Sequence, residues 1–188
     1  STKSIMKNII INAAMEEVNL RGLRFTMQDL ATRLKVSKRS LYENFSSKEN
    51  LIDEMVDIIL ADMAKEEQEI YAGDAPVISK LEKLLTLHPY AAEMFNKNIY
   101  EDLRRLFPKQ WEKVEASRAE RQKHLQLLVE QGIQDGVLRP VNVNLVGQIL
   151  KDAFDSFTSY SFLESNGLTY KKAMQELLDI LFKGMLLK

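Results

Sequence analysis

Thirty residues, from Gly22 to Leu51, constrain the fold more than any other part of this 188-residue chain. They contain two short helical patterns joined by a tight turn. Thr26, followed three positions later by Asp29, predicts an N-cap in which the hydroxyl accepts from a free backbone N–H and the carboxylate favours the positive helix end. Ser37 is expected to cap the second helix in the same way. The segment therefore predicts a helix-turn-helix.

Apolar residues in this segment define the buried faces of both short helices. In the first helix Leu30, Ala31 and Leu34 recur at helical spacing, and in the second Leu41 and Phe45 do the same. The other side chains of the second helix then point outward near its N-terminal half, where a recognition helix faces the major groove of DNA. The residues predicted to contact DNA are Thr26, Ser37, Lys38, Arg39, Ser40, Tyr42 and Lys48.

The chemistry of these side chains suggests two kinds of contact. Lys38 and Arg39 are candidates for base edges, because an ammonium or a guanidinium pairs well with guanine O6 and N7. The hydroxyls and Lys48 are expected to hold phosphates, Lys48 from the first turn of the following helix, where backbone N–H groups also attract anions. For Tyr42 the alternative is that its ring packs on the domain and only the hydroxyl is free.

The spacing of these residues is specific enough to suggest a family. It is carried by Ile10, Ala13, Ala14, Gly22, Phe25, Thr26, Met27, Asp29, Leu30, Ala31, Val36, Ser37, Ser40, Leu41, Tyr42, Phe45, Lys48, Glu49 and Leu51. This pattern resembles the N-terminal domain of TetR-type transcriptional repressors (TetR/AcrR-like). The resemblance implies a three-helix DNA-binding domain, an all-helical C-terminal domain that dimerises, and usually a small-molecule inducer.

One turn position departs from the family pattern, because Lys35 stands where glycine is usual. A turn residue with positive φ costs a non-glycine side chain roughly 1 kcal/mol or more. Lys35 therefore either bears modest strain or marks a turn with a different backbone. We expect a shift in the entry angle of the second helix rather than its loss.

The distribution of charge agrees with a DNA-binding N-terminus. Residues 1–50 hold nine Lys and Arg against five acidic residues, a net charge of +4, and the rest of the chain holds 17 against 22, a net charge of −5. Cations near DNA release counterions, while an acidic body is kept away from the phosphates. Charge alone also fits basic residues that only solvate a small helical bundle, so the motif decides between the two.

Helical periodicity continues along the whole chain, and no segment predicts a strand. We expect an all-α fold of about nine helices, with a helix-turn-helix head over residues 1–47 and a ligand-binding and dimerisation body over residues 48–188. The first helix should span Lys3 to Arg21, and a long connecting helix should end near Gly73. Further helices are predicted over 76–87, 90–97, 99–106, 109–135, 143–164 and 170–187.

Composition argues against several other classes of function. The chain has no cysteine, which removes thiolate and disulfide chemistry and suits a reducing cytoplasm. It has no signal-like segment and no apolar run of membrane-spanning length, so we expect a soluble cytoplasmic protein. His88 and His124 lack carboxylates at ligand spacing, so no metal and no cofactor are expected. We also expect no enzymatic activity, because the sequence has no Gly-rich phosphate loop, no Cys nucleophile and no HExxH motif.

The last two predicted helices carry broad apolar stripes. Their apolar surface is too large for one small body to bury by itself. In the family these helices meet those of a second subunit in a four-helix bundle, where Gly147, Ser156 and Gly184 would allow close approach. The alternative is that both stripes are internal core. The predicted interface residues of the homodimer are Val146, Ile149, Leu150, Ala153, Phe157, Leu178, Leu181, Phe182 and Met185.

Met and aromatic side chains in the body could line an adaptable pocket for a small apolar or amphipathic inducer. Such residues at helical spacing are also ordinary core. The candidates for the ligand pocket are Met55, Ile59, Met63, His88, Phe95, Leu103, Phe107, Trp111, Leu128 and Phe154.

Together these patterns predict a sequence-specific DNA-binding transcriptional regulator, a ligand-responsive repressor that acts as a homodimer on a palindromic operator. In this mechanism a ligand in the body tilts the connecting helix and moves the two heads out of register. The alternative is a helical small-molecule-binding protein of the same fold with weak or lost DNA binding. Activation instead of repression also remains open.

Overall fold

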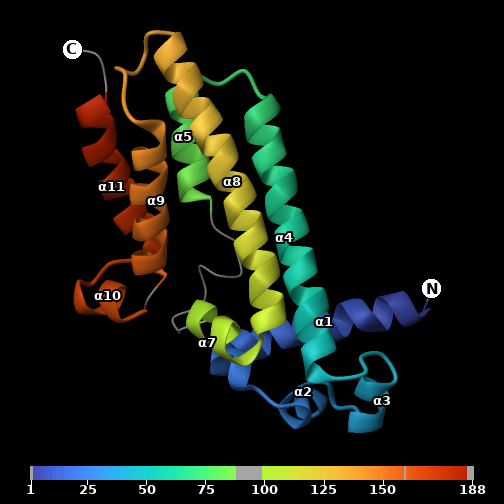
Figure 1. Cartoon of the computed structure of the whole chain (residues 1–188). Helices are drawn as coiled ribbons and strands as arrows, with labels where there is room; N and C mark the ends of the chain where they lie inside the picture. The colour runs from blue at the N-terminus through green and yellow to red at the C-terminus, as the bar shows by residue number, and fades with distance from the viewer. Residues whose placement is uncertain (1, 88–98, 159, 186–188) are drawn as a thin grey trace. The chain divides into compact units, whose positions relative to one another are not determined.

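The computed structural model of the chain describes residues 2–87, 99–158 and 160–185, leaving out the side chain of Tyr160, and throughout that part its regular elements are helices (Figure 1). The all-α class predicted from the sequence is confirmed. The predicted helix over 90–97 lies outside the described residues.

The chain divides into two compact units by the contacts of its backbone. Unit 1 consists of Ser1–Leu60 and Tyr90–Val114, and unit 2 consists of Ala61–Pro89 and Glu115–Lys188. Two long helices, α4 and α8, contribute residues to both units.

Unit 1 is built around the N-terminal helices. Its elements are α1 (Thr2–Arg21), the 3-10 turn η1 (Gly22–Arg24), α2 (Met27–Leu34), α3 (Lys38–Tyr42), the first half of α4 (Lys48–Ala72), α7 (Ile99–Leu106) and the start of α8 (Pro108–Gln134). α1 ends at Gly22, whose φ of 68° is the left-handed conformation expected of a glycine C-cap. The predicted inward residues Leu30, Leu41 and Phe45 are fully buried in one apolar core with Ile10 of α1.

Unit 2 contains the rest of the described chain. Its elements are the second half of α4, α5 (Val77–Thr86), most of α8, α9 (Val143–Phe157), α10 (Tyr160–Ser165) and α11 (Tyr170–Met185). Its core gathers Leu81 and Leu84 of α5, Val129 of α8 and Leu178 of α11. The apolar stripes of α9 and α11 are thus partly used inside the same chain.

The single helix predicted over 143–164 is wrong, because the structure has α9 and α10 in its place. α9 ends where the Thr158 hydroxyl donates to the Phe154 carbonyl at 2.9 Å. The Thr158 backbone N–H donates to the same carbonyl at 2.9 Å, and a hydroxyl that bonds back one turn in this way slightly destabilises a helix. α10 in turn ends before Gly167, which has a φ of 61°.

No helix of the described residues is both long and apolar enough to cross a lipid bilayer.

Candidate nucleic-acid interface

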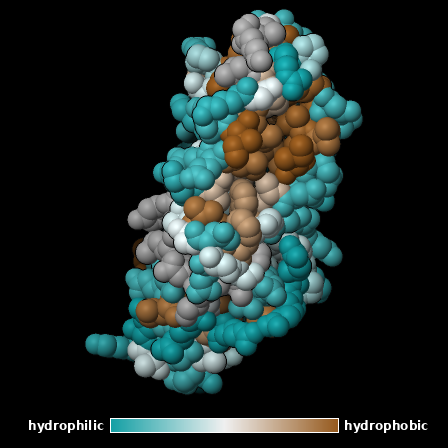
Figure 2. Space-filling view, turned by 90° about the vertical axis from the view of Figure 1, so that its left-hand side faces the viewer, coloured by the Kyte–Doolittle hydropathy of each residue, from teal (hydrophilic) through white to brown (hydrophobic). Residues whose placement is uncertain are grey.

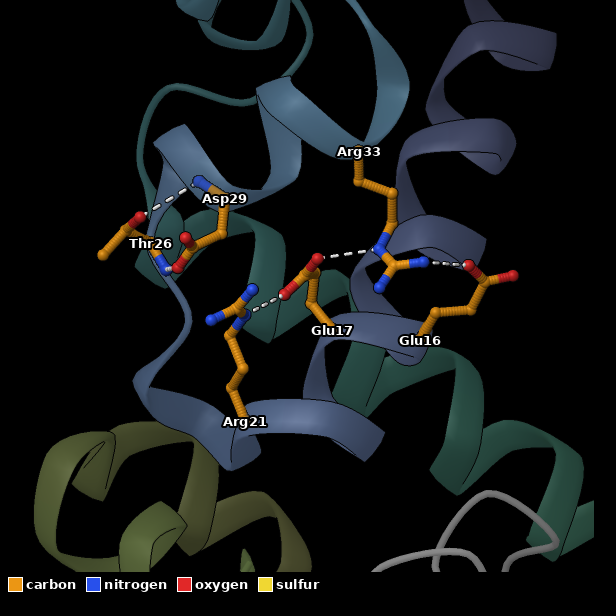
Figure 3. A network of polar contacts seen from close by, with 6 residues as sticks. All are labelled: Glu16, Glu17, Arg21, Thr26, Asp29 and Arg33. Atoms are coloured by element: carbon orange, nitrogen blue, oxygen red, sulfur yellow. Dashed lines mark hydrogen bonds and ion pairs between the residues drawn. The ribbon is translucent and has the colours of Figure 1, made fainter.

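The first helix of the pair, α2, begins with a reciprocal cap. The backbone N–H of Asp29 donates to the Thr26 hydroxyl at 3.1 Å, and the backbone N–H of Thr26 donates to the Asp29 carboxylate at 2.8 Å (Figure 3). Hydrogen bonds from the Thr26 backbone and hydroxyl hold the pKa of Asp29 below its ordinary value. The predicted cap is confirmed, and it gives α2 a defined start.

The turn between α2 and α3 is a Schellman motif closed by Lys35. The Lys35 N–H donates to the Thr32 carbonyl at 3.2 Å, and the Val36 N–H donates to the Ala31 carbonyl at 3.1 Å. Lys35 has φ 55° and ψ 39°, so a lysine adopts the left-handed conformation that favours glycine. Of the two alternatives for Lys35, strain or a turn with a different backbone, the structure shows strain, because Lys35 has the left-handed backbone of a Schellman turn.

α3 is a short helix with a capped start and a mostly exposed surface. The Ser40 N–H donates to the Ser37 hydroxyl at 3.1 Å, as predicted for the cap. Leu41 faces the core and is fully buried, whereas Lys38 and Arg39 are exposed. Tyr42 is 48% exposed. The first turn of α3 therefore presents two cations. Its backbone is held at the start by the Ser37 cap, and the helix is held against the core by Leu41.

Lys48 is placed differently from the other predicted contacts. Its ammonium donates to the Leu23 carbonyl at 2.5 Å and lies 4.5 Å from the centroid of the Phe25 ring. Burial lowers the pKa of Lys48 from its ordinary value. The side chain is thus engaged inside unit 1, while the backbone of Lys48 forms the start of α4.

Several other basic residues of the N-terminal segment are also engaged within unit 1. The pairs are Lys7 with Glu54, Arg21 with Glu17, Arg24 with Asp102, and Arg33 with Glu16 and Glu17. On the turn and α3, the exposed cations are Lys35, Lys38 and Arg39, and Arg39 makes only a loose pair at 3.4 Å with the exposed Glu43. The positive charge that faces outward is therefore concentrated beside the predicted recognition helix.

The Glu17 network was not foreseen from the sequence. Arg33 of α2 and Arg21 of α1 both donate to the carboxylate of Glu17, and Figure 3 shows it between the two guanidinium groups. The available signal was an acid at position 17 within the buried stripe of α1, beside Ala14 and Val18. An acid in such a stripe needs a cationic partner from a neighbouring helix.

The predicted dimer residues fall into two groups. Buried in the core of unit 2 are Val146, Leu150, Leu178, Phe182 and Met185. Partly exposed are Ile149, Ala153, Phe157 and Leu181. Figure 2 shows apolar side chains gathered on the face that carries α9 and α11. Leu145 of α9 and Ile180 of α11 are 59% and 68% exposed, and neither is among the predicted interface residues.

Two of the three small residues proposed to aid close approach of subunits lie exposed, and one is used inside the chain. A Cβ at Gly147 would lie 2.8 Å from the Gln126 amide nitrogen, so this glycine lets α9 approach α8 of the same unit. Gly184 has open space around it, and Ser156 is exposed. The expected role of Gly147 between subunits is therefore corrected.

The described candidates for the ligand pocket are divided between the two units. Met55, Leu103, Phe107 and Trp111 pack in unit 1, where Ile59 also lies, while Met63 and Leu128 lie in unit 2. His88 and Phe95 lie outside the described residues. Unit 2 contains a groove between α8 and α9, and among the candidates that the structure describes Phe154 alone lines it. The aromatic residues of unit 1 are core because their apolar faces are needed to hold α1, α4, α7 and α8 together.

A capped helix pair with a left-handed turn and exposed cations at the start of its second helix defines a helix-turn-helix DNA-binding protein. The match to known proteins makes this class more specific. Residues 10–55 match the family described as bacterial regulatory proteins, tetR family.

Relatives extend this similarity beyond the N-terminal segment. The chain is 25% identical over 181 residues to the uncharacterized HTH-type transcriptional regulator YvaF of Bacillus subtilis (strain 168), covering 96% of this chain and 95% of YvaF. It is 27% identical over 172 residues to the HTH-type transcriptional repressor KstR2 of Mycobacterium tuberculosis (strain CDC 1551 / Oshkosh), covering 88% of this chain and 85% of KstR2.

A solved structure shows the same fold. The TetR-family transcriptional regulator from Cytophaga hutchinsonii aligns with a TM-score of 0.74 and 17% identity, covering 100% of this chain and 98% of that one. The resemblance to the TetR family that the residue pattern predicted is confirmed by the match over residues 10–55 and by these relatives.

Proposed function

We propose that this protein is a ligand-responsive transcriptional repressor that binds a palindromic operator as a homodimer in the cytoplasm and catalyses no reaction. The observation that carries the proposal is the first turn of α3, where Lys38 and Arg39 are exposed on a helix capped by Ser37. A rigid backbone limits the entropy lost when these side chains bind base edges. Repression is the role named for the relative KstR2.

Within this proposal, Lys38 and Arg39 contact base edges, and the hydroxyls of Thr26, Ser37, Ser40 and Tyr42 contact phosphates. The Thr26 and Ser37 hydroxyls accept from backbone N–H groups, and the Thr26 hydroxyl also bonds the Asp29 carboxylate. The Ser37 and Ser40 hydroxyls lie 3.1 Å apart, so one can donate to the other and leave the second proton for a phosphate oxygen. Lys48 contributes only if its ammonium leaves the Leu23 carbonyl. A smaller salt dependence of DNA binding in Lys48→Met would detect that contribution.

The dimer is proposed because one short helix reads only a few base pairs, and two heads roughly 34–36 Å apart reach successive major grooves. The apolar face on α9 and α11, with Leu145, Ile149 and Ile180 exposed, supports this arrangement. Large exposed apolar side chains that cluster on one face are typical of an interface.

For the regulatory step we propose that a head over residues 1–47 binds DNA and that a body over residues 48–188 binds the ligand and forms the dimer. A ligand in the body favours one of two dimer conformations and moves the heads out of register with the operator. The ligand shifts this equilibrium only through its different affinities for the two conformations.

The decisive experiment is selection of bound duplexes from a random pool by the full-length protein, followed by binding to the selected site at two salt concentrations. A repeated half-site about one helical turn from its inverted copy is the expected result. Absence of salt-dependent retention on any duplex would instead favour a helical ligand-binding protein that does not bind DNA.

A further inference from the structure

The groove between α8 and α9 of unit 2 combines apolar side chains with cations. Its volume is about 110 Å³. Leu125 and Val129 of α8 and Val146 and Leu150 of α9 supply apolar surface. Arg118, Arg121 and Lys151 also line the groove, and Glu115 is the one acidic side chain among its described lining residues. This composition suits a molecule with an apolar body and a negative charge.

Arg121 has hydrogen-bond donors to spare at the groove. Its Nε donates to Glu67 at 2.5 Å, and its Nη2 has only the weak sulfur acceptor of Met63 at 3.9 Å. Its side chain is just 12% exposed, so water access to the guanidinium is limited. A guanidinium carries five N–H donors in a planar fork that matches a carboxylate. Among the described residues the two Nη atoms have no further acceptor, so most of their donors are unpaired in a residue that lines the groove.

The cations around the groove differ in how far acidic partners compensate their charge. Arg118 is already paired with Glu115 at 2.6 Å and Asp155 at 2.8 Å. Its guanidinium also lies 3.9 Å from the centroid of the Phe154 ring, so it orders the wall of the groove.

The other two cations are less fully compensated. Arg121 has the single acidic partner Glu67, and Lys151 is exposed with no ion pair among the described residues. Arg121, Lys151 and Glu67 together carry one net positive charge, whereas Arg118, Glu115 and Asp155 together carry one net negative charge. A ligand with one negative charge would balance the first group.

We propose that this groove binds an apolar monocarboxylate, with the carboxylate at Arg121 and Lys151 and the hydrocarbon on Leu125, Val146 and Leu150. The assignment rests on the proposed function, since it gives the chemical class of the inducer. Neither a neutral nor a cationic apolar molecule satisfies the spare donors of Arg121 and the charge of Lys151 together.

Three probes with the same hydrocarbon chain test this class: octanoate, octan-1-ol and octylammonium, each titrated into the full-length protein by calorimetry. Octanoate should bind at least about tenfold more tightly than the other two, since it alone brings a negatively charged acceptor to Arg121 and Lys151. Lys151→Gln should weaken octanoate binding about tenfold and leave octan-1-ol unchanged. Equal affinity for all three probes, or a preference for octan-1-ol, overturns the proposal.

A matched pair of variants tests whether octanoate binds in the groove between α8 and α9. Ala119 and Ala116 are both exposed on α8, but only Ala119 lines the groove. Ala119→Phe should abolish octanoate binding, and Ala116→Phe should retain it. Equal loss in both variants places the ligand elsewhere and contradicts the assignment.

Binding to the selected duplex, measured without any probe, separates this inference from the proposed function. If Ala119→Phe and Lys151→Gln weaken octanoate binding but the protein retains no duplex, the groove assignment stands and the regulator proposal is wrong. If the protein binds the duplex but shows no preference for octanoate, the regulator proposal stands and the groove assignment is wrong.

Discussion

The guanidinium of Arg33 on α2 donates to the carboxylate of Glu17 on α1 over 2.7 Å, and Glu17 is only 3% exposed. Arg21 donates to the other oxygen of the same carboxylate over 2.9 Å. A buried carboxylate is tolerated only when such donors replace its water. This ion pair therefore ties the first helix to the helix that precedes the predicted recognition helix.

Replacing the carboxylate of Glu17 by an amide should destabilise unit 1. Glu17→Gln keeps the shape of the side chain but removes its charge, and we expect the free energy of unfolding to fall by about 1–3 kcal/mol. Glu16→Gln is the control, because Glu16 is 65% exposed and its pair with Arg33 is a surface contact. Urea denaturation followed by circular dichroism measures both, and equal effects would show that burial of Glu17 does not matter.

The left-handed turn should be more stable with glycine. Lys35→Gly removes the side chain that is strained at φ 55°, so we expect a gain of about 1 kcal/mol in the free energy of unfolding. Lys35→Ala loses the same charge but retains a Cβ, and it should give no such gain. Thermal unfolding of the two variants separates backbone strain from charge, and a similar gain in both would assign the effect to charge.

Arg39 should contribute to sequence preference rather than to general DNA affinity. Arg39→Ala is expected to cost about 1–3 kcal/mol on the selected duplex and much less on a random one, because its guanidinium is proposed to pair with a base edge. Lys65→Ala, at an exposed position of α4 in unit 2, serves as the control. Fluorescence anisotropy at fixed salt measures each affinity. Equal losses for Arg39→Ala on both duplexes would remove Arg39 from base recognition.

The cap of α2 should give a pH-dependent contribution to stability. The pKa of Asp29 is lowered by its hydrogen bonds to Thr26, so the folded state favours the ionised carboxylate. The stabilisation is present above the ordinary value of 3.8 and is lost as the pH falls from there through the lowered pKa. Asp29→Asn lacks this contribution.

The difference in unfolding free energy between the original chain and Asp29→Asn should therefore be constant near neutral pH and narrow below about pH 4. Urea titrations at a series of pH values measure it. A difference that widens as the pH falls would contradict the sign of the shift.

The apolar face of α9 and α11 should hold two chains together. Ile180→Glu places a charge on a side chain that is 68% exposed in the single chain, and we expect the dimer dissociation constant to rise at least about tenfold. Leu127→Glu is the matched control, since Leu127 is 60% exposed but lies on α8. Sedimentation velocity across a concentration series decides, and equal weakening by the two variants would move the interface away from α9 and α11.

The local structure of the helix pair was predictable because its determinants are close in sequence. Thr26 with Asp29, and Ser37 with Ser40, form their caps within one helical turn. α1 ends just before Gly22, because glycine adopts the left-handed conformation of a helix C-cap without steric strain. The break between α9 and α10 was not predicted, because helical periodicity continues across it and a hydroxyl that bonds back one turn, as that of Thr158 does, destabilises a helix only slightly.

By itself, the sequence determined the helical class, the capped helix pair, and the two cations at the start of α3, because these depend on residue type and short spacing. Tertiary structure decided which of the other charged and apolar residues are free. It placed Lys48 and Arg33 against groups inside unit 1, Val146 and Leu178 in the core of unit 2, and Arg121 at a groove. Those outcomes depend on which helices face one another, and helical periodicity marks an apolar face without naming its partner.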